Sequence, residues 1–344
     1  MKGRVIVLDH IDGRAAAALL VDGRLEDILI DAPGEVLRPG AILRGIAQRQ
    51  VKGLGGIFID LGDGRTGFLR QTKGIAPGKP LLVQVTGYAR EGKAVPVSTR
   101  LTIKGRFAIA TPGAPGRNVS RAIADADARS ALAALGAGID LPEDVGLILR
   151  SAAEAAPEAD VLADAQSIAE VTRAILSDAA GPAADLLLDG PDPHEVALSD
   201  WGGADEVDEG PDSFARLGVT EALDPLRRPR ALLPGGASMV IEPTAALVAV
   251  DVNTGPDTSP AAGLKANIAA ARALPRELRC RGLGGAITVD FAPFPRADRH
   301  RVEQALKAAF RAEGDETVLA GWTALGHFEL QRKRARLPLA EVLP

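Results

Sequence analysis

Two aspartates in the last third of the chain each follow directly on a short apolar run. Asp251 ends the run Leu247–Asp251, and Asp290 ends the run Ala286–Asp290. A helical pattern at 264–281 separates the runs, which predicts parallel strands that bring both carboxylates to the same end of a sheet. Two adjacent carboxylates repel each other unless a cation lies between them, and Mg²⁺ commonly uses one or two carboxylates together with water and phosphate oxygens. Asp251 and Asp290 are therefore predicted metal ligands that could activate water against a phosphodiester.

Two further polar residues stand near these aspartates in the sequence. Asn253 follows Asp251 by two positions, on the same face of an extended strand, and could orient a carboxylate by hydrogen bonding. Arg281 ends the helical pattern between the two runs. The alternative for each aspartate alone is a turn or a helix cap, because aspartate often follows a strand in these roles. The set of Asp251, Asn253, Asp290 and Arg281 raises the case for catalysis above that for either aspartate alone.

The elements that would carry this site form an α/β region. Apolar runs predict strands at 239–242, 246–250 and 286–290. Apolar periodicity predicts helices at 264–281 and 301–312. A strand, a helix and a further strand of this kind form a crossover between parallel neighbours.

The earlier part of the chain shows other patterns. Val5–Ile30 has three apolar runs separated by two Asp-Gly turns, which predicts an antiparallel meander. Gly40–Arg100 has five short apolar runs separated by Gly-rich breaks, which favours a small Greek-key barrel of the OB type. Two helical patterns follow, at 125–136 and 157–179. A strand-like apolar run lies between them, at 145–149.

The formal net charge of −5 hides a strong asymmetry along the chain. Residues 37–120 hold 14 Lys or Arg against three Asp or Glu, whereas residues 121–226 hold five Arg against 23 acids. A negative total would argue against a nucleic acid partner, but the basic segment coincides with the predicted barrel and could follow a phosphate backbone. The acidic stretch 189–213 contains Pro and Gly and is predicted to be a surface loop.

Aromatic side chains in the basic segment could stack on bases. Phe58 and Phe68 fall in two of its short apolar runs, and single-strand RNA binders of the OB type combine such rings with basic side chains. The alternative for Phe58, which lies between Ile57 and Ile59, is a place in the barrel core. Periodicity alone slightly favours this alternative.

Composition excludes several classes of protein. Hydrophobic residues make up 46% and charged residues 25%, the proportions of an ordinary soluble globular protein. No apolar run approaches the ~18 residues of a membrane span, and charges interrupt the first 20 residues, so we expect a cytoplasmic rather than a secreted or membrane protein. Cys280 is the only cysteine, which excludes an intramolecular disulfide and a multi-cysteine zinc site.

Taken in order, these motifs resemble the catalytic core of the ribonuclease E/G family. That family has an Asp-x-Asn-Ser/Thr-Gly strand end, a helix closing with Leu-Arg-x-Arg-x-Leu-Gly-Gly, and an Ile-Asp-Phe strand end. The matching segments here are Val250–Gly255, Leu278–Gly285 and Val289–Phe291. Other segments are also similar to the family: Ile57–Gly62, Thr66–Leu69, Gly146–Ser151 and Gly326–Leu330.

The resemblance implies a multidomain architecture of the α+β and α/β classes. Its expected parts are an RNase H-like subdomain (1–36 plus 180–226), an inserted OB-fold RNA-binding barrel (37–103), a 5′-sensor-like subdomain (104–179) and a DNase I-like catalytic subdomain (227–344).

The resemblance also implies roles for the candidate catalytic residues. Asp251 and Asp290 would bind Mg²⁺, and Asn253 would orient a ligand carboxylate. Arg281 would contact a phosphate or the transition state. The implied activity is Mg²⁺-dependent hydrolysis of single-stranded RNA at internal positions, which leaves 5′-phosphate products.

Contacts to RNA are implied elsewhere in the chain. Phe58, Phe68 and Lys93 match RNA-binding positions of the barrel, which reverses the preference for a core position at Phe58. Arg150 and Ser151 match an Arg-Thr pair in the pocket that senses a 5′-monophosphate.

Two family features have no counterpart in the sequence. A second pocket arginine is expected before Gly326, yet no Lys or Arg stands between Arg311 and Arg332, so we expect weakened sensing of the 5′-monophosphate. A Cys-Pro-x-Cys zinc link is absent before Pro344, so any homo-oligomer is expected to form without it. The four histidines, including His327, show no ligand spacing and are interpreted as surface or packing residues.

Two other functions stay open. A non-catalytic RNA-binding protein of the same ancestry would fit the missing zinc link and the altered sensor pocket. A phosphodiesterase for DNA or small phosphodiesters is favoured less, because the barrel and its basic charge point to RNA.

Overall fold

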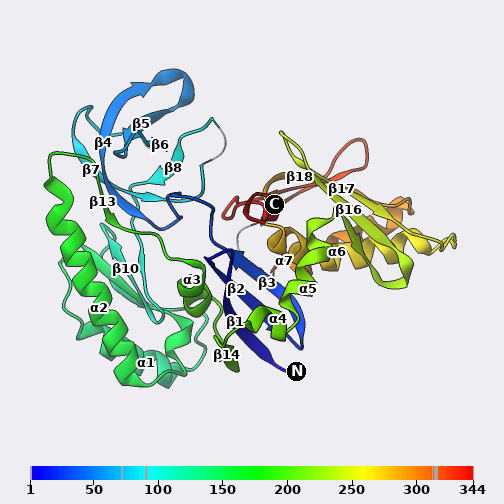
Figure 1. Ribbon diagram of the computed structural model, residues 1–344, viewed down its shortest axis with the longest axis horizontal. Helices are drawn as coiled ribbons and strands as arrows, with labels where there is room; N and C mark the ends of the chain where they lie inside the picture. Colours follow the sequence, from blue (N-terminus) through cyan, green and yellow to red (C-terminus); the bar gives the residue numbers. More distant parts are fainter. Residues whose placement is uncertain (1, 71–72, 90–91, 312, 314–316, 344) are drawn as a thin grey trace. The chain divides into compact units, whose positions relative to one another are not determined.

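The computed structural model describes residues 2–70, 73–89, 92–311, 313 and 317–343. Contacts within the chain divide it into two units (Figure 1). Unit 1 comprises Met1–Pro33 and Asp205–Pro344, and unit 2 comprises Gly34–Ala204. Each unit contains two sheets among the described residues.

The first sheet of unit 1 is the predicted antiparallel meander with one added strand. Its strands are β1 (Arg4–Ile11), β2 (Arg14–Val21), β3 (Arg24–Ile30) and β14 (Glu206–Asp208). Asp12 and Gly13 both have positive φ, as a two-residue type I′ hairpin turn requires. Strand β14 pairs with β1 in parallel.

Three short helices pack near this meander. They are α4 (Ser213–Arg216), α5 (Val219–Leu223) and α8 (Leu339–Val342). Phe214, Val219 and Leu339 share a core cluster with Val5 and Val7 of β1. The cluster ties the start of the chain to the segments that precede and follow the second sheet.

The second sheet of unit 1 carries the candidate catalytic residues. Its six strands, in spatial order, are β15 (Arg230–Leu232), β16 (Ser238–Pro243), β17 (Val248–Asn253), β18 (Gly285–Asp290), β20 (Phe328–Arg332) and β19 (Thr317–Trp322). Strands β17 and β18 are parallel neighbours, as the crossover pattern predicted.

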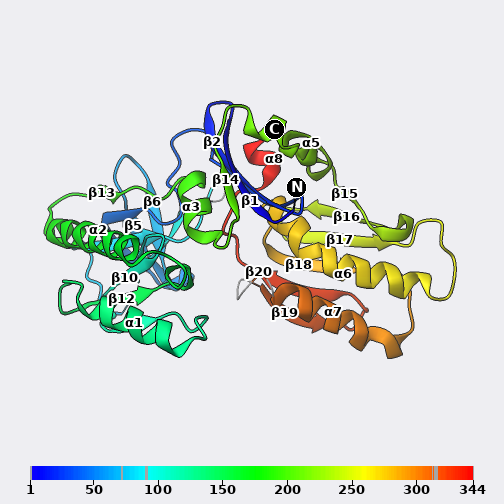
Figure 2. The same cartoon turned by 90° about the horizontal axis from the view of Figure 1, so that it is seen from below.

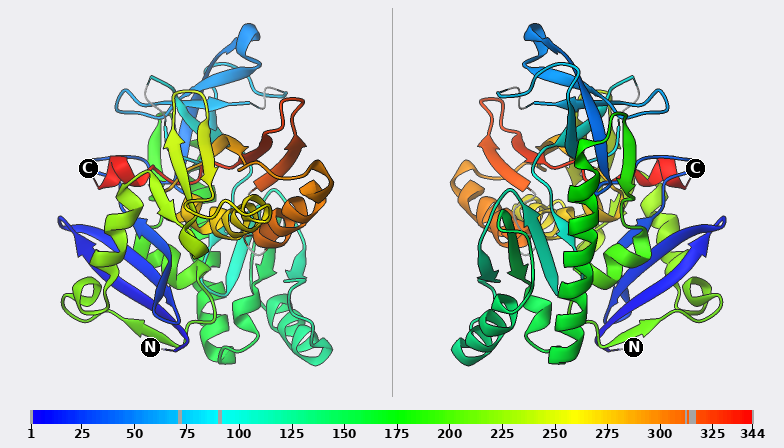
Figure 3. Two further views of the ribbon diagram at one scale, coloured as in Figure 1. Left: turned by 90° about the vertical axis from the view of Figure 1, so that its right-hand side faces the viewer. Right: turned by 90° about the vertical axis from the view of Figure 1, so that its left-hand side faces the viewer.

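Helices α6 (Ala262–Cys280) and α7 (Arg299–Arg311) cover one face of this sheet (Figure 2, Figure 3). Both confirm predicted helices to within two residues at each end. Val248, Val250 and Val252 of β17 are buried with them in one core. Because side chains alternate along a strand, Asp251 and Asn253 lie on the opposite, exposed face.

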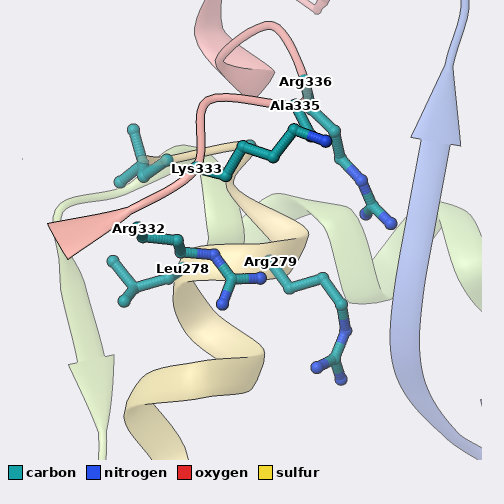
Figure 4. Close-up of a pocket in the computed structure, with 8 residues that line it drawn as sticks. Leu278, Arg279, Arg332, Lys333, Ala335 and Arg336 are labelled. Carbon is teal, nitrogen blue, oxygen red and sulfur yellow. The ribbon is translucent and has the colours of Figure 1, made fainter. Parts of the chain in front are cut away.

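An ion-pair network joins β3 to α6 and to the segment after β20. The Asp27 carboxylate contacts Arg279 and Arg336, and Glu313 contacts Arg279 and Arg332. Figure 4 shows these three arginines around a small pocket at the end of α6. Since carboxylates already neutralise its arginines, this basic cluster stabilises the fold rather than offering a phosphate site.

The first sheet of unit 2 closes into a five-stranded barrel. The strands follow the order β4 (Ile42–Val51), β5 (Gly56–Asp60), β6 (Thr66–Leu69), β8 (Val95–Ser98) and β7 (Pro80–Val85), and β7 pairs back onto β4. This confirms the predicted barrel of five short strands. Strand β13 (Asp185–Leu188) adds to the edge at β4.

The second sheet of unit 2 is small and packs against two helices. Its order is β11 (Arg117–Val119), β12 (Val145–Leu149), β10 (Ala108–Pro112) and β9 (Ile103–Lys104), and its helices are α1 (Ala126–Ala137) and α2 (Glu158–Ser177). These elements share one core cluster. The predicted strand at 145–149 and the two predicted helices are confirmed.

The prediction of a surface loop over 189–213 is wrong. Helix α3 (Pro193–Asp200) lies in this stretch, and so does β14. The Asp192 side chain accepts a hydrogen bond from the Glu195 N–H at 2.9 Å, and the Glu195 side chain accepts one from the Asp192 N–H at 2.8 Å. The sequence Asp-Pro-His-Glu at 192–195 has the spacing of a capping box, which indicates a helix start. The loop prediction rested instead on the acidic composition of the stretch.

The observed units also divide the stretch 180–226, which the family resemblance assigns to one subdomain. Strand β13 and helix α3 belong to unit 2, and the boundary falls at Ala204. Short 3-10 helices complete the described elements: Lys52–Leu54, Ser151–Ala153, Asp178–Ala180, Asp224–Arg227, Pro234–Gly236 and Arg296–Asp298.

Candidate active site

Asp251 and Asp290 are direct partners across two parallel strands. The register of β17 and β18 pairs Val250 with Val289 and Asp251 with Asp290. Both side chains are exposed on the face that α6 and α7 leave uncovered, and the Asp290 side chain is 63% exposed. Neighbouring residues on one face of a sheet hold their side chains close together. The structure therefore brings the two predicted carboxylates together.

Asn253 is also brought into this site. Its side-chain amide donates a hydrogen bond to Oδ2 of Asp251 at 2.8 Å, which fixes the orientation of that carboxylate. The turn after Asn253 depends on Gly255, which has a φ of +69°. A Cβ at this glycine would lie 2.1 Å from the Gly236 carbonyl oxygen, so no larger residue fits there.

The loop after Asp290 is held by a buried amide. Asn267 of α6 donates to the Ala292 carbonyl oxygen at 2.9 Å, and the Ala292 N–H donates back to Asn267 at 3.0 Å. Asn267 is completely buried, and a buried amide with both groups satisfied is a strong geometric restraint. Asn267 therefore positions the end of β18 from behind the sheet.

His327 is a site residue that sequence reasoning missed. Its Nδ1 lies 3.4 Å from Oδ1 of Asp290, whereas the sequence alone indicates a surface or packing residue. The proximity of His327 to Asp290 follows only from the pairing of β18 with β20. In the sequence 37 positions separate the two residues, and no ligand spacing connects them.

Aromatic packing supports the hairpin that carries His327. The Trp322 ring lies 5.6 Å from Phe291, 5.9 Å from Phe294 and 5.2 Å from Phe328 between ring centroids. The Arg299 guanidinium lies over the same indole at 4.6 Å. Trp322 thus anchors the hairpin beside Asp290.

The donor set at this edge fits a hard divalent cation. Among the described residues, no Lys or Arg lies within ion-pair distance of Asp251 or Asp290, so two adjacent negative charges stand without a cationic side chain. Oδ2 of Asp251 is engaged by Asn253, while its Oδ1 has no protein partner in the described part of the chain. Exposed carboxylate oxygens with room for water match the ligands that Mg²⁺ uses.

The structure places Arg281 away from the paired aspartates, at the end of α6. Arg281 is only 6% exposed. One terminal nitrogen donates to the carbonyl oxygens of Leu226 and Arg228, and the rest of the guanidinium pairs with Glu277. With its nitrogens engaged inside the protein, Arg281 holds the end of α6 and is not available to a phosphate.

Phe58 and Phe68 come together on the outside of the barrel. They are paired across β5 and β6, and their ring centroids lie 5.5 Å apart in an edge-to-face arrangement. Ile57 and Ile59 point into the core instead, so the core alternative for Phe58 is wrong. The Phe68 ring lies over Gly56, where a Cβ would meet it at 2.4 Å.

Lys93 is an exposed residue in the segment before β8. Val95, two positions later, pairs with Gly67 of β6, and Pro96 pairs with Phe68. The lysine therefore precedes the strand that neighbours the aromatic pair. Its place on the barrel is compatible with a phosphate contact near stacked bases.

Arg150 and Ser151 lie in another part of unit 2. Arg150 follows β12, donates to the Gly105 carbonyl oxygen at 2.7 Å, and contacts Asp200 of α3 at 2.5 Å. Ser151 is exposed at the start of a 3-10 helix. The Asp164 carboxylate holds the Gly105 segment by accepting N–H hydrogen bonds from three successive residues, Arg106, Phe107 and Ala108. The predicted RNA-binding residues thus form two separate groups within unit 2.

The sequence comparisons agree with this arrangement of motifs. The family model described as the ribonuclease E/G family matches residues 102–208 and 203–335. The chain is similar to ribonuclease E of Nostoc sp., at 28% identity over 92% of this chain and 54% of that protein. It is similar to ribonuclease G of Escherichia coli, at 28% identity over 95% of this chain and 79% of that protein. It is also similar to ribonuclease E of Escherichia coli, at 26% identity over 94% of this chain and 36% of that protein.

The chain thus spans about half or less of the length of the ribonuclease E relatives. In the part of the chain that the structure describes, no single helix is both long enough and apolar enough to cross a membrane.

Proposed function

Because the chain belongs to the ribonuclease E/G family, we propose that it is a Mg²⁺-dependent endoribonuclease that cuts single-stranded RNA at internal positions. Its products would carry 5′-phosphate ends, and its role would be rRNA or mRNA processing or decay in the cytoplasm. The observation that carries the proposal is the pairing of Asp251 with Asp290 at the exposed ends of two parallel strands.

Asp251 and Asp290 would hold the ion, and Asn253 would keep the Asp251 carboxylate in one orientation. When bound, Mg²⁺ supplies an activated water and stabilises the negative charge that builds on the scissile phosphate. The protein's part is to keep two carboxylates at a fixed separation on a rigid sheet edge, since loosely held ligands lose catalytic precision. The buried Asn267 amide contributes by fixing the backbone after Asp290.

The RNA strand would be held by unit 2. Phe58 and Phe68 offer ring surfaces on the outside of the barrel, and base stacking on such rings tolerates any sequence. The exposed Lys93 would add a backbone phosphate contact. The barrel would then be an OB-fold RNA-binding domain, and the remaining sheet of unit 2, with Arg150 and Ser151, a 5′-sensor-like subdomain.

The architecture of unit 1 follows from the same proposal. The six-stranded sheet with α6 and α7 would be a DNase I-like catalytic subdomain, and the meander of β1, β2 and β3 with β14 would be RNase H-like. The family membership supports these assignments.

The proposal is tested by the substrate and by the chemistry of the product. An unstructured RNA and a DNA of the same sequence would be incubated with the protein in Mg²⁺ or in EDTA. We expect internal cuts in the RNA only, in Mg²⁺ only, with 5′ ends that a phosphatase converts to hydroxyls. Binding of RNA without cleavage in any divalent ion would instead establish a non-catalytic RNA-binding protein, and equal cleavage of the DNA would establish a general phosphodiesterase.

A further inference from the structure

The hairpin between β19 and β20 places His327 directly beside Asp290. Antiparallel pairing puts Val289 opposite Phe328, so the next positions along the two strands are Asp290 and His327. Asp290 in turn pairs with Asp251 on its other side. The three side chains Asp251, Asp290 and His327 thus occupy one row at the exposed end of the sheet.

Within the described part of the chain, the nitrogen of His327 that faces Asp290 has no other partner. Nδ1 is buried and makes no hydrogen bond to any residue that the structure describes, although the side chain as a whole is 35% exposed. A buried polar nitrogen without a partner costs free energy. Its near neighbour is Oδ1 of Asp290 at 3.4 Å, so the carboxylate is the group that can satisfy it.

The position of His327 is fixed by its own backbone. Its N–H donates to the Thr323 hydroxyl at 3.2 Å, and its carbonyl oxygen accepts from the Thr323 N–H at 2.8 Å. The Trp322 ring packs against Phe291, the residue that follows Asp290. The imidazole is therefore presented to Asp290 by a turn that is held at both ends.

We propose that His327 is a positioning residue for Asp290. Its ring, protonated at Nδ1, donates to Oδ1 and leaves Oδ2 of the same carboxylate for the divalent ion. This inference rests on the metal site proposed above. His327 does for Asp290 what the Asn253 amide does for Asp251, so each carboxylate gives one oxygen to a neighbouring N–H and the other to the ion.

Direct ligation of the ion by His327 is the competing role. Among the described residues, no group of three His, Cys, Asp or Glu side chains is arranged to hold a metal ion, which favours the hydrogen-bonding role. The two roles also differ in their effect on metal preference. Imidazole ligands favour transition metals, whereas carboxylate and water ligands suit Mg²⁺ and Mn²⁺ alike.

Isothermal titration of Mg²⁺ and of Co²⁺ into the purified protein distinguishes these roles. The variants are His327→Leu, which removes both ring nitrogens, and His327→Asn, whose amide nitrogen can take the place of Nδ1. Leu325→Ala is the matched control, because Leu325 lies in the same turn and is 87% exposed. Thermal unfolding of each variant verifies that it is folded.

We expect His327→Leu to lower the affinity for Mg²⁺ and the affinity for Co²⁺ by a similar factor of about 10. Loss of a residue that supports a metal ligand usually has an effect of this size. His327→Asn should recover most of the affinity, and Leu325→Ala should equal the parent. Unchanged affinity in His327→Leu would overturn the inference, as would a loss that His327→Asn does not recover. A loss confined to Co²⁺ would show direct ligation and overturn it as well.

The titration also separates this inference from the proposed function. A parent protein that binds neither ion would overturn the metal site together with the role of His327. Intact ion binding with the expected effects, but without RNA cleavage, would overturn only the proposed activity.

Discussion

The guanidinium of Arg150 lies 2.5 Å from one carboxylate oxygen of Asp200, and the Lys104 ammonium lies 3.8 Å from the other. Asp200 ends helix α3, in the stretch that we had predicted to be a loop. A carboxylate of the protein therefore occupies the position beside Arg150 where the family resemblance implies a 5′-monophosphate. Any RNA end that binds Arg150 must displace or share this partner.

Replacing Asp200 with Asn should increase the preference for a 5′-monophosphorylated RNA end. The substitution removes the negative charge beside Arg150 and Lys104, so an RNA end that binds Arg150 no longer has to break this ion pair. Such a pair contributes about 0.2–1 kcal/mol, which corresponds to a roughly 1.5- to 5-fold gain in affinity for the 5′-phosphate oligonucleotide. Fluorescence anisotropy with 5′-phosphate and 5′-hydroxyl oligonucleotides measures it. Asp189→Asn, which breaks the exposed pair with Arg38, is the control. An equal gain for both oligonucleotides would show that Arg150 does not sense the 5′ end.

Substituting Phe58 or Phe68 by Ala should weaken single-stranded RNA binding without unfolding the barrel. Both rings are partly exposed outside the core, and loss of a stacked base costs about 1–3 kcal/mol, or roughly 5- to 150-fold in Kd. Leu54→Ala removes another exposed apolar side chain of the barrel and should leave Kd unchanged. An RNA affinity equal to the parent's in both Phe variants would remove these rings from the interface.

The variant Arg281→Met should have a lower free energy of unfolding than the parent, and as long as it is folded it should still cleave RNA. It removes one of the two arginines that pair with the buried Glu277, Arg276 being the other, and it removes donors to two backbone carbonyl groups. Because Arg276 still pairs with Glu277, the loss should stay below the about 3–5 kcal/mol of a buried pair that is broken completely. Urea unfolding measures the loss, and Arg272→Met, on the exposed side of α6, should have little effect. If Arg281→Met is as stable as the parent but no longer cleaves RNA, this result would instead support the phosphate contact that the family resemblance implies.

Cys280 should resist alkylation at neutral pH in the folded protein. Burial, together with the nearby negative charge of Asp27, raises the pKa of its thiol to about 12, and only the thiolate reacts. The thiolate fraction therefore grows only as the pH approaches that value. Mass spectrometry after iodoacetamide treatment at pH near 8 should find no adduct until guanidinium chloride is added. Rapid labelling of the folded protein would show that the α6 end opens.

The local patterns of the sequence predicted the elements that have strong local causes. The Asp-Gly turns required positive φ, and they produced the meander. The apolar run 246–250 predicted a strand, and the helix between the two apolar runs predicted parallel strands that bring Asp251 and Asp290 to the same end of a sheet. These features depend on residues that are close in the sequence or on a topological rule.

The features that were missed depend on distant contacts. Arg281 was placed in the site by its proximity to the motif, but Leu226, Arg228 and Glu277 engage it inside the protein. His327 became a neighbour of Asp290 only through antiparallel pairing of β18 with β20. A helix as short as α3 gives little periodicity, so its capping box was the one signal available.

The rate of Mg²⁺-dependent cleavage of an unstructured RNA by Asp251→Asn and Asp290→Asn tests the proposed metal site and its activity together. Each variant keeps the size of the side chain and removes one negative charge. We expect each to lower the rate by more than about 100-fold, beyond the 10- to 100-fold typical of a residue that only supports a ligand. Glu303→Gln, which alters a partly exposed carboxylate on α7 paired with Lys307, should cleave like the parent. Cleavage by both Asp variants at the parent's rate would contradict the proposed metal site and the activity built on it.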